Sequence, residues 1–317
     1  MSRWNNPILE SQMRIRMRGM GAFISIMIYV AVLLGAVLLA SLSAYFGTCG
    51  VLEVTRQGMY IYNTLAYLQF ALLVLLTPAL TSGLISSERE RQTLDLLLCS
   101  RMGAFRIVMG KLLSGTLFVM LLVVCSLPMM ALVYTVGDLR FGDVFQLMLY
   151  LLMCILTIGS MGVFFSTLVR RTTAATVVTY CMVLVYGIGT LVGGFAHSAF
   201  VTAAQQLLNP YGTIALYVSP ILYTNPFMGL FWLITGHMGM TNGNGVGILS
   251  EIMRMFTNGM YYDTFMVTSW MPAWLITLIS MLVVAALFVL GSMALLRRDR
   301  KQVVSRKVKK ALAQERG

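Results

Sequence analysis

Long uncharged runs divide this chain. Asp, Glu, Lys and Arg are all absent from six stretches, which are residues 19–52, 57–87, 112–137, 144–169, 172–250 and 264–296. A helix needs about 20 apolar residues, at about 1.5 Å rise per residue, to cross a bilayer, and each stretch is longer than that. Strands of a membrane β-barrel would alternate polar and apolar residues over roughly 10 positions, and these runs do not. The pattern therefore predicts membrane-spanning α-helices.

We expect an all-α membrane protein with six spans. The first span follows three arginines, as a secretion signal would, but its apolar stretch of about 25 residues is longer than the roughly 7–15 residues of a signal. It is therefore expected to remain in the mature protein. The six predicted spans cover residues 22–46, 60–85, 108–136, 144–168, 173–195 and 273–296.

Composition narrows the class of protein further. Of the 317 residues, 58% are hydrophobic and 11% are charged, whereas a soluble domain has about 25% charged residues. This excludes a soluble enzyme, a disordered chain and a disulfide-stapled secreted domain. The five cysteines form no Cys-x-x-Cys pair, so we expect small buried side chains and no metal site.

The basic residues predict the orientation. With six spans, 20 of the 23 Lys and Arg residues fall on one side of the membrane, and only Arg56, Arg140 and Arg254 fall on the other. Cytoplasmic loops carry the excess of Lys and Arg, so both termini are expected in the cytoplasm. The net charge of +12 then reflects topology and contact with anionic membrane lipid, and no nucleic-acid partner is expected.

The longest uncharged run leaves a seventh span open. Residues 211–236 are apolar enough to cross, but a full crossing would divide the basic residues almost equally between the two sides. Pro220 and the Asn225-Pro226 pair also interrupt a helix interior. A broken, re-entrant or interfacial pair of short helices on the outer face fits better.

These assignments divide the chain into three parts. Residues 1–21 are expected to form an interfacial amphipathic helix, or otherwise a frayed basic terminus that only orients the first span. Residues 22–296 form the transmembrane domain, with a charged cytoplasmic segment at 86–107 and a long, partly helical outer loop at 196–272. Residues 297–317 form a basic cytoplasmic tail.

The charged segment after the second span is the most informative part of the chain. Ser87 and Glu90 have the spacing of a capping box, which predicts a helix start here. Arg91 and Asp95 are four residues apart and are expected to pair, while Leu94, Leu97 and Leu98 form an apolar stripe. Such a helix needs a surface to lie on, which is lipid, the rest of the protein or a partner.

These residues resemble a known family. The run of residues 88–95, ERERQTLD, followed by Gly110-Lys111-Leu112, is similar to the permeases of type-2 ATP-binding-cassette (ABC) exporters. Asn209-Pro210 in the outer loop is similar too. The family run reads Glu-Arg-Glu-x-Gly-Thr-Leu-Glu, so this chain departs from it with Gln92 for Gly and Asp95 for Glu. It also has Met109 for Leu, and Ser100-Arg101 where a turn containing Pro is common.

The resemblance implies that the segment is a short coupling helix, docked on a separate ATP-hydrolysing subunit. It implies partner contacts by Glu88, Arg89, Glu90, Arg91, Thr93, Leu94, Asp95 and Leu97. The alternative is a loop whose charges only enforce topology. A GxxxxGK[ST] phosphate loop is absent from the chain, so ATP and Mg²⁺ are expected on the partner and the chain itself is not expected to be an enzyme.

Polar residues inside the spans are candidates for a substrate pathway. They are Asn63, Gln69, Thr77, Thr81, Thr176, Thr179 and Tyr180. Hydrogen bonding between helices is the alternative role for such residues. Ionisable pairs are absent from the predicted spans, which argues against proton-coupled transport.

The expected function is that of the membrane subunit of an ATP-driven exporter in a cell membrane. The membrane is expected to be a bacterial plasma membrane, and two permeases, identical or different, are expected to line one path. The exported substrate is unidentified, and a mostly uncharged interior favours an amphipathic one. A non-transporting sensor or regulator built on an ABC-type complex stays an alternative, as does a stand-alone secondary transporter or scaffold.

Overall fold

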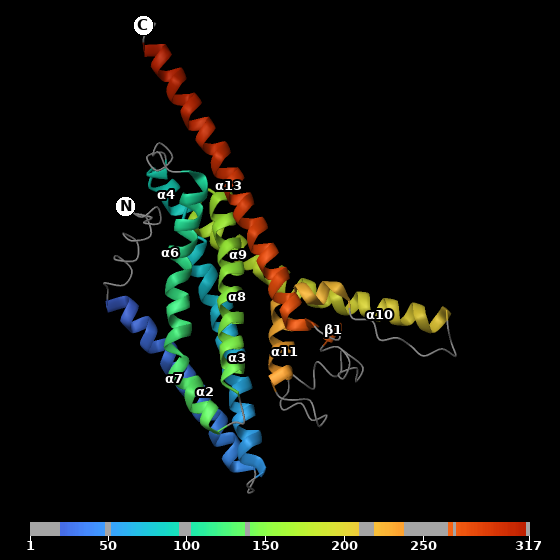
Figure 1. The fold of residues 1–317 in the computed structure, drawn as a ribbon. Coiled ribbons are helices and arrows are strands. Elements are labelled where there is room, and N and C mark those ends of the chain that lie inside the picture. Colours follow the sequence, from blue (N-terminus) through green and yellow to red (C-terminus); the bar gives the residue numbers. More distant parts are fainter. Residues whose placement is uncertain are drawn as a thin grey trace.

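The computed structural model describes residues 20–47, 52–94, 103–136, 140–208, 219–237, 266–268 and 271–314 (Figure 1). Nearly all of them are helical. The elements are α2 (Met20–Gly47), α3 (Leu52–Thr81), α4 (Ser86–Glu90), α6 (Ala104–Cys125), α7 (Leu127–Val136), α8 (Phe141–Leu168), α9 (Thr172–Leu184), the π-helix η1 (Val185–Gly189), α10 (Thr190–Leu208), the 3₁₀-helix η2 (Pro220–Thr224), α11 (Pro226–His237), β1 (Met266–Thr268), β2 (Met271–Pro272) and α13 (Ala273–Gln314).

The six predicted spans are confirmed among the described residues. Helices long and apolar enough to cross a membrane cover Phe23–Leu42, Tyr60–Glu90, Ala104–Ala131, Phe141–Leu168, Thr172–Val201 and Ala273–Asp299. The third is interrupted at Ser126, between α6 and α7, where the Ser126 hydroxyl donates to the carbonyl of Val123 at 2.6 Å. Pro128 follows within the first turn of α7, where a missing backbone N–H is tolerated.

Helix α8 occupies the centre of the fold. It packs against α3, α6, α9, α11 and α13, and in Figure 1 it stands upright within the bundle. The core cluster around it includes Tyr62, Leu65, Leu122, Tyr150 and Ile155, all almost completely buried.

Small residues allow α3, α6 and α8 to approach closely. A Cβ added at Gly162 of α8 would collide with the side chain of Thr81 on α3, and one at Gly115 of α6 would lie 2.6 Å from a methyl of Leu84. A Cβ at Gly159 would lie 2.5 Å from a methyl of Thr116 on α6. In a bilayer, where apolar side chains are solvated by lipid, such close backbone approach is a main source of helix association.

The fifth span is not a straight helix. Its hydrogen-bonding pattern changes from α to π at η1, after which α10 projects from the side of the bundle (Figure 1). The Asn225 side chain joins η1 to α11, because its Nδ2 donates to the Gly187 carbonyl and to Thr190 Oγ1, both at 2.6 Å. Its Oδ1 accepts the backbone N–H groups of Phe227 and Met228, which caps α11.

Two short helices, η2 and α11, form the described part of residues 211–236. Pro220 and Pro226 begin them, at the first helical position that suits proline. Helix α11 has 12 residues, about 18 Å at 1.5 Å per residue, which is too short to cross a hydrocarbon core of about 30 Å. A re-entrant or interfacial position for it stays a prediction. Residues 1–19, including most of the expected interfacial helix, and Asn209-Pro210 lie outside the described residues.

The last helix, α13, is the longest, with 42 residues. Its first part packs against α8, α11 and α6, and the remainder continues past the end of the bundle that carries α4 (Figure 1). The basic tail expected at residues 297–317 is therefore helical as far as Gln314.

Candidate coupling site

Helix α4 lies at one end of the bundle, directly after α3 (Figure 1). A turn over residues 82–85 separates it from α3. The expected helix start is confirmed, but the capping box of Ser87 and Glu90 is wrong, because Ile85 is the N-cap residue and caps with no side-chain hydrogen bond. The hydroxyl of Ser166, from α8, accepts the backbone N–H groups of Ile85 and Ser86 at 2.8 and 3.0 Å instead. A neighbouring helix thus replaces the local cap.

The end of α4 has a defined geometry. The Gln92 N–H donates to the Arg89 carbonyl and the Thr93 N–H to the Glu88 carbonyl, which is the Schellman pattern of a helix C-terminus. In this motif the first residue after the C-cap has a left-handed backbone conformation. That residue is Gln92, with φ 58°. Glycine adopts this conformation without cost, which gives a physical reason for the glycine that the resembled family has here. In this chain the position is occupied by Gln92, whose Cβ makes the left-handed conformation strained.

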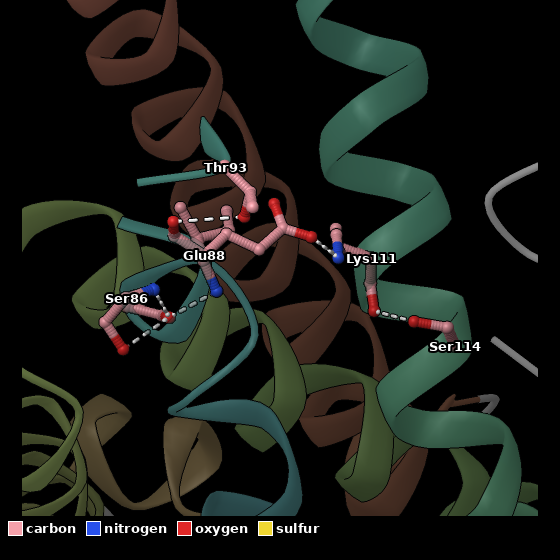
Figure 2. A network of polar contacts seen from close by, with 7 residues as sticks. Ser86, Glu88, Thr93, Lys111 and Ser114 are labelled. Atoms are coloured by element: carbon pink, nitrogen blue, oxygen red, sulfur yellow. Dashed lines mark hydrogen bonds and ion pairs between the residues drawn. The ribbon is translucent and has the colours of Figure 1, made fainter. Parts of the chain in front are cut away.

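Glu88 and Lys111 form an ion pair between α4 and α6 (Figure 2). Only 3% of the Lys111 side chain and 22% of the Glu88 side chain are exposed. The second carboxylate oxygen of Glu88 is buried without a hydrogen-bond partner in the described part of the chain. Because removal of one partner would leave a buried charge uncompensated, this pair is a firm attachment of α4.

Arg89 reaches the last span. Its Nη2 lies 2.5 Å from Oδ2 of Asp299 on α13, and the two side chains are 21% and 34% exposed. Leu296, one turn earlier on α13, is buried in the apolar cluster that holds Ile85 and Leu94. The ion pair therefore lies at the edge of an apolar contact between α13 and residues 85–94, which we call the coupling segment after the resemblance described above.

Glu90 reaches the fifth span. Its carboxylate accepts the backbone N–H and the hydroxyl of Thr172, both at 2.9 Å. Thr172 is the first residue of α9, where a negative charge is favourable because the N–H groups of a first helical turn have no partners within the helix. The Glu90 side chain thus caps a different helix from the one predicted.

The remaining residues of the predicted contact set divide into two groups. Arg91, Gln92 and Thr93 are exposed, and the Thr93 hydroxyl donates to the Glu88 carbonyl. Leu94 is buried with Ile107 and Leu112 of α6. Asp95 and Leu97, together with the expected Arg91–Asp95 pair, lie outside the described residues. Among the described residues of the predicted contact set and Gln92, the exposed positions are thus 90–93. Of these, Glu90 is already bonded to Thr172.

The candidate pathway residues lie mostly at helix contacts. Asn63, Gln69, Thr77, Thr81 and Thr179 are buried, and Thr176 and Tyr180 are partly buried. Thr176 of α9 shares a hydrogen bond with Ser82 in the turn after α3, and the Tyr180 hydroxyl donates to the Leu75 carbonyl of α3. These two contacts match the alternative of bonding between helices, and a pathway role for the set stays a prediction.

Sequence reasoning missed three partners of the coupling segment. They are Ser166, Thr172 and Asp299, which come from α8, α9 and α13. Asp299 had a signal, since it is an acidic residue among the basic residues 297–301. Ser166 and Thr172 had none, because serine and threonine are common in membrane helices. Three or more His, Cys, Asp or Glu side chains suited to a metal are not grouped anywhere in the described residues.

Comparison with known proteins places this arrangement in a family. The chain has no match among curated proteins. A family model described as "ABC-2 family transporter protein" matches residues 10–300, which include all six candidate spans and the coupling segment. The chain therefore belongs to the ABC-2 family of transporter proteins.

Proposed function

We propose that this chain is the permease subunit of an ATP-driven exporter and works with a separate ATP-binding-cassette subunit. The observation that carries the proposal is the exposed corner of residues 91–93, which directly follows α4, a short helix attached to four other helices. A partner that moves this corner acts on the transmembrane bundle directly.

The corner suits contact with a soluble partner. Arg91, Gln92 and Thr93 are polar and exposed, and such residues set partner choice and association rate more than affinity. The distribution of basic residues supports a cytoplasmic position for the α4 end, where ATP is available. In this proposal ATP and Mg²⁺ bind the partner.

A second permease completes the path in this proposal. Helices α2 and α9 expose many large apolar side chains, including Phe23, Leu39, Val177 and Leu184. Lipid and a second copy, or a similar permease, would share these faces in a bacterial plasma membrane. The substrate moves outward, and the mostly uncharged spans suit an amphipathic molecule.

The association is tested by reversing one charge on the corner. The tagged full chain is purified in mild detergent with its associated proteins, and Mg-ATP hydrolysis and photolabelling by an azido-ATP probe are measured. We expect wild-type protein to bring down a labelled ATPase. Arg91→Glu should lower its recovery about tenfold, which corresponds to about 1.4 kcal/mol of binding free energy.

Arg140→Glu is the matched control, because Arg140 is also exposed but precedes α8 at the other end of the bundle. It should recover the ATPase as wild type does. Absence of an ATPase from the wild-type preparation would overturn the proposal. Export is tested separately, by mass spectrometry of small molecules retained when the recovered ATPase is made inactive.

A further inference from the structure

We propose that the Arg89–Asp299 ion pair transmits displacement of the coupling segment to the sixth span, with both residues acting as positioning residues. This inference rests on the proposed function and adds the route by which movement passes through the permease. It also reassigns Arg89, because a side chain bonded to α13 is not free to hold a partner subunit.

The geometry of α4 is the starting point. Residues 88, 89 and 90 are consecutive in a helix, so their side chains leave it about 100° apart. Each of the three bonds to a different helix, namely α6, α13 and α9. A short helix bonded on three sides cannot shift without stretching or breaking at least one of these three contacts.

The three contacts differ in how easily they break. The Glu88–Lys111 pair is the most buried, so its rupture would leave charge in a poorly solvated place. The Arg89–Asp299 pair is about a quarter exposed, and partly exposed ion pairs exchange for water at little cost. Glu88 therefore anchors α4, while Arg89 provides a contact that can break and form again.

The helices at the two ends differ as well. Lys111 is buried on α6, next to Leu112, a member of the apolar cluster that also holds Val163 of α8. Asp299 lies on α13, whose most apolar stretch is only 17% buried, against 61% for the third span, which contains α6. The span with the smaller buried share is expected to be the easier one to move. Displacement of α4 about its anchor at Lys111 is thus expected to appear in α13.

The test exchanges the two charges. Arg89→Glu, Asp299→Arg and the double variant are purified with the ATPase in lipid nanodiscs, and amide hydrogen exchange of residues 293–305 is compared in Mg-ATP and Mg-ADP. We expect the nucleotide-dependent difference in wild type to fall at least fivefold in each single variant. The double variant should recover at least half of it, because the pair is restored in reverse.

Two further measurements show whether the loss is specific to the ion pair. ATPase recovery should stay within twofold of wild type in all variants, since neither side chain faces the partner. Arg298→Glu, which reverses an exposed charge beside Asp299, should keep the wild-type exchange difference.

The outcomes are distinct. Two results would overturn the inference and leave the proposed function intact, provided that the ATPase still co-purifies normally. One is a wild-type nucleotide-dependent exchange difference in the single variants. The other is a double variant in which the lost exchange difference is not restored. A wild-type complex without an ATPase would overturn the proposed function, and the inference with it.

Discussion

The spans of the core and those of the periphery have similar hydropathy but different surroundings. In the most apolar stretches of the second, third and fourth spans, 50%, 61% and 72% of residues are buried, against 17% in each of the first, fifth and sixth. Mean hydropathy lies between 1.9 and 2.7 for all six and does not separate the two groups. Apolar character thus does not decide which spans are buried, and small residues such as Gly115, Gly159 and Gly162 allow the buried spans to pack closely.

The largest expected effect comes from filling the contact between core helices. Gly162→Leu places a side chain against Thr81, and overpacking of this kind costs about 3 kcal/mol. The thermal unfolding midpoint of the purified protein should fall by roughly 5–10 °C. The control is Gly35→Leu in the peripheral α2, where an added Cβ meets nothing within 4 Å. Equal effects of the two variants would contradict the distinction between core and periphery.

A smaller effect is expected where the exposed fifth span joins buried α11. Asn225→Ala removes the cap of α11 and the hydrogen bonds to Gly187 of η1 and Thr190 of α10, for a loss of about 2 kcal/mol. Amide exchange over residues 185–208 should increase. Asn225→Ser retains a capping oxygen but is too short for the η1 contacts, so about half the loss is expected.

Thr224→Ala serves as the control for this site, because among the described residues the Thr224 hydroxyl bonds only to the Ile221 carbonyl of its own turn. It should change stability by less than about 0.5 kcal/mol. If Asn225→Ala left amide exchange in η1 and α10 unchanged, the Asn225 side chain would not be what joins the fifth span to α11.

The smallest effect is expected at the end of α4. Gln92→Gly relieves a left-handed φ of 58° and should stabilise the turn by about 1 kcal/mol. Amide exchange over residues 86–94 should slow about fivefold, which is what 1 kcal/mol corresponds to. Gln92→Ala removes the same polar group but keeps Cβ, so no comparable slowing is expected. Equal slowing in both variants would rule out backbone strain as the cause.

Much of the fold followed from the sequence. The runs without charge predict six helices, and six candidate spans are found at nearly those positions. The helix start after the second span was predicted correctly, but its cap was not. Ser87 and Glu90 have the right spacing for a local cap. Instead, Ser166 of α8 accepts the N–H groups of Ile85 and Ser86, and the Glu90 carboxylate accepts the N–H of Thr172 on α9.

For residues 86–95, the sequence pattern predicted a helix start but not the partners of the charged side chains. The residue pattern located this segment, and the family match covers it. The pattern did not separate Glu88, Arg89 and Glu90, which bond to other helices, from the exposed corner at 91–93. Charged residues next to a membrane can face water, a partner or another helix, and sequence spacing does not distinguish these surroundings.

The sequence alone determined that this is a membrane protein of six helical spans, because a helix satisfies its own backbone hydrogen bonds and apolar length is a local property. It also pointed to the family, through a local motif. Only the tertiary structure decided which spans are central and which partners the charges take. Arg89 and Asp299 are 210 residues apart in the chain, and their contact depends on how α4 and α13 pack together, which no local pattern encodes.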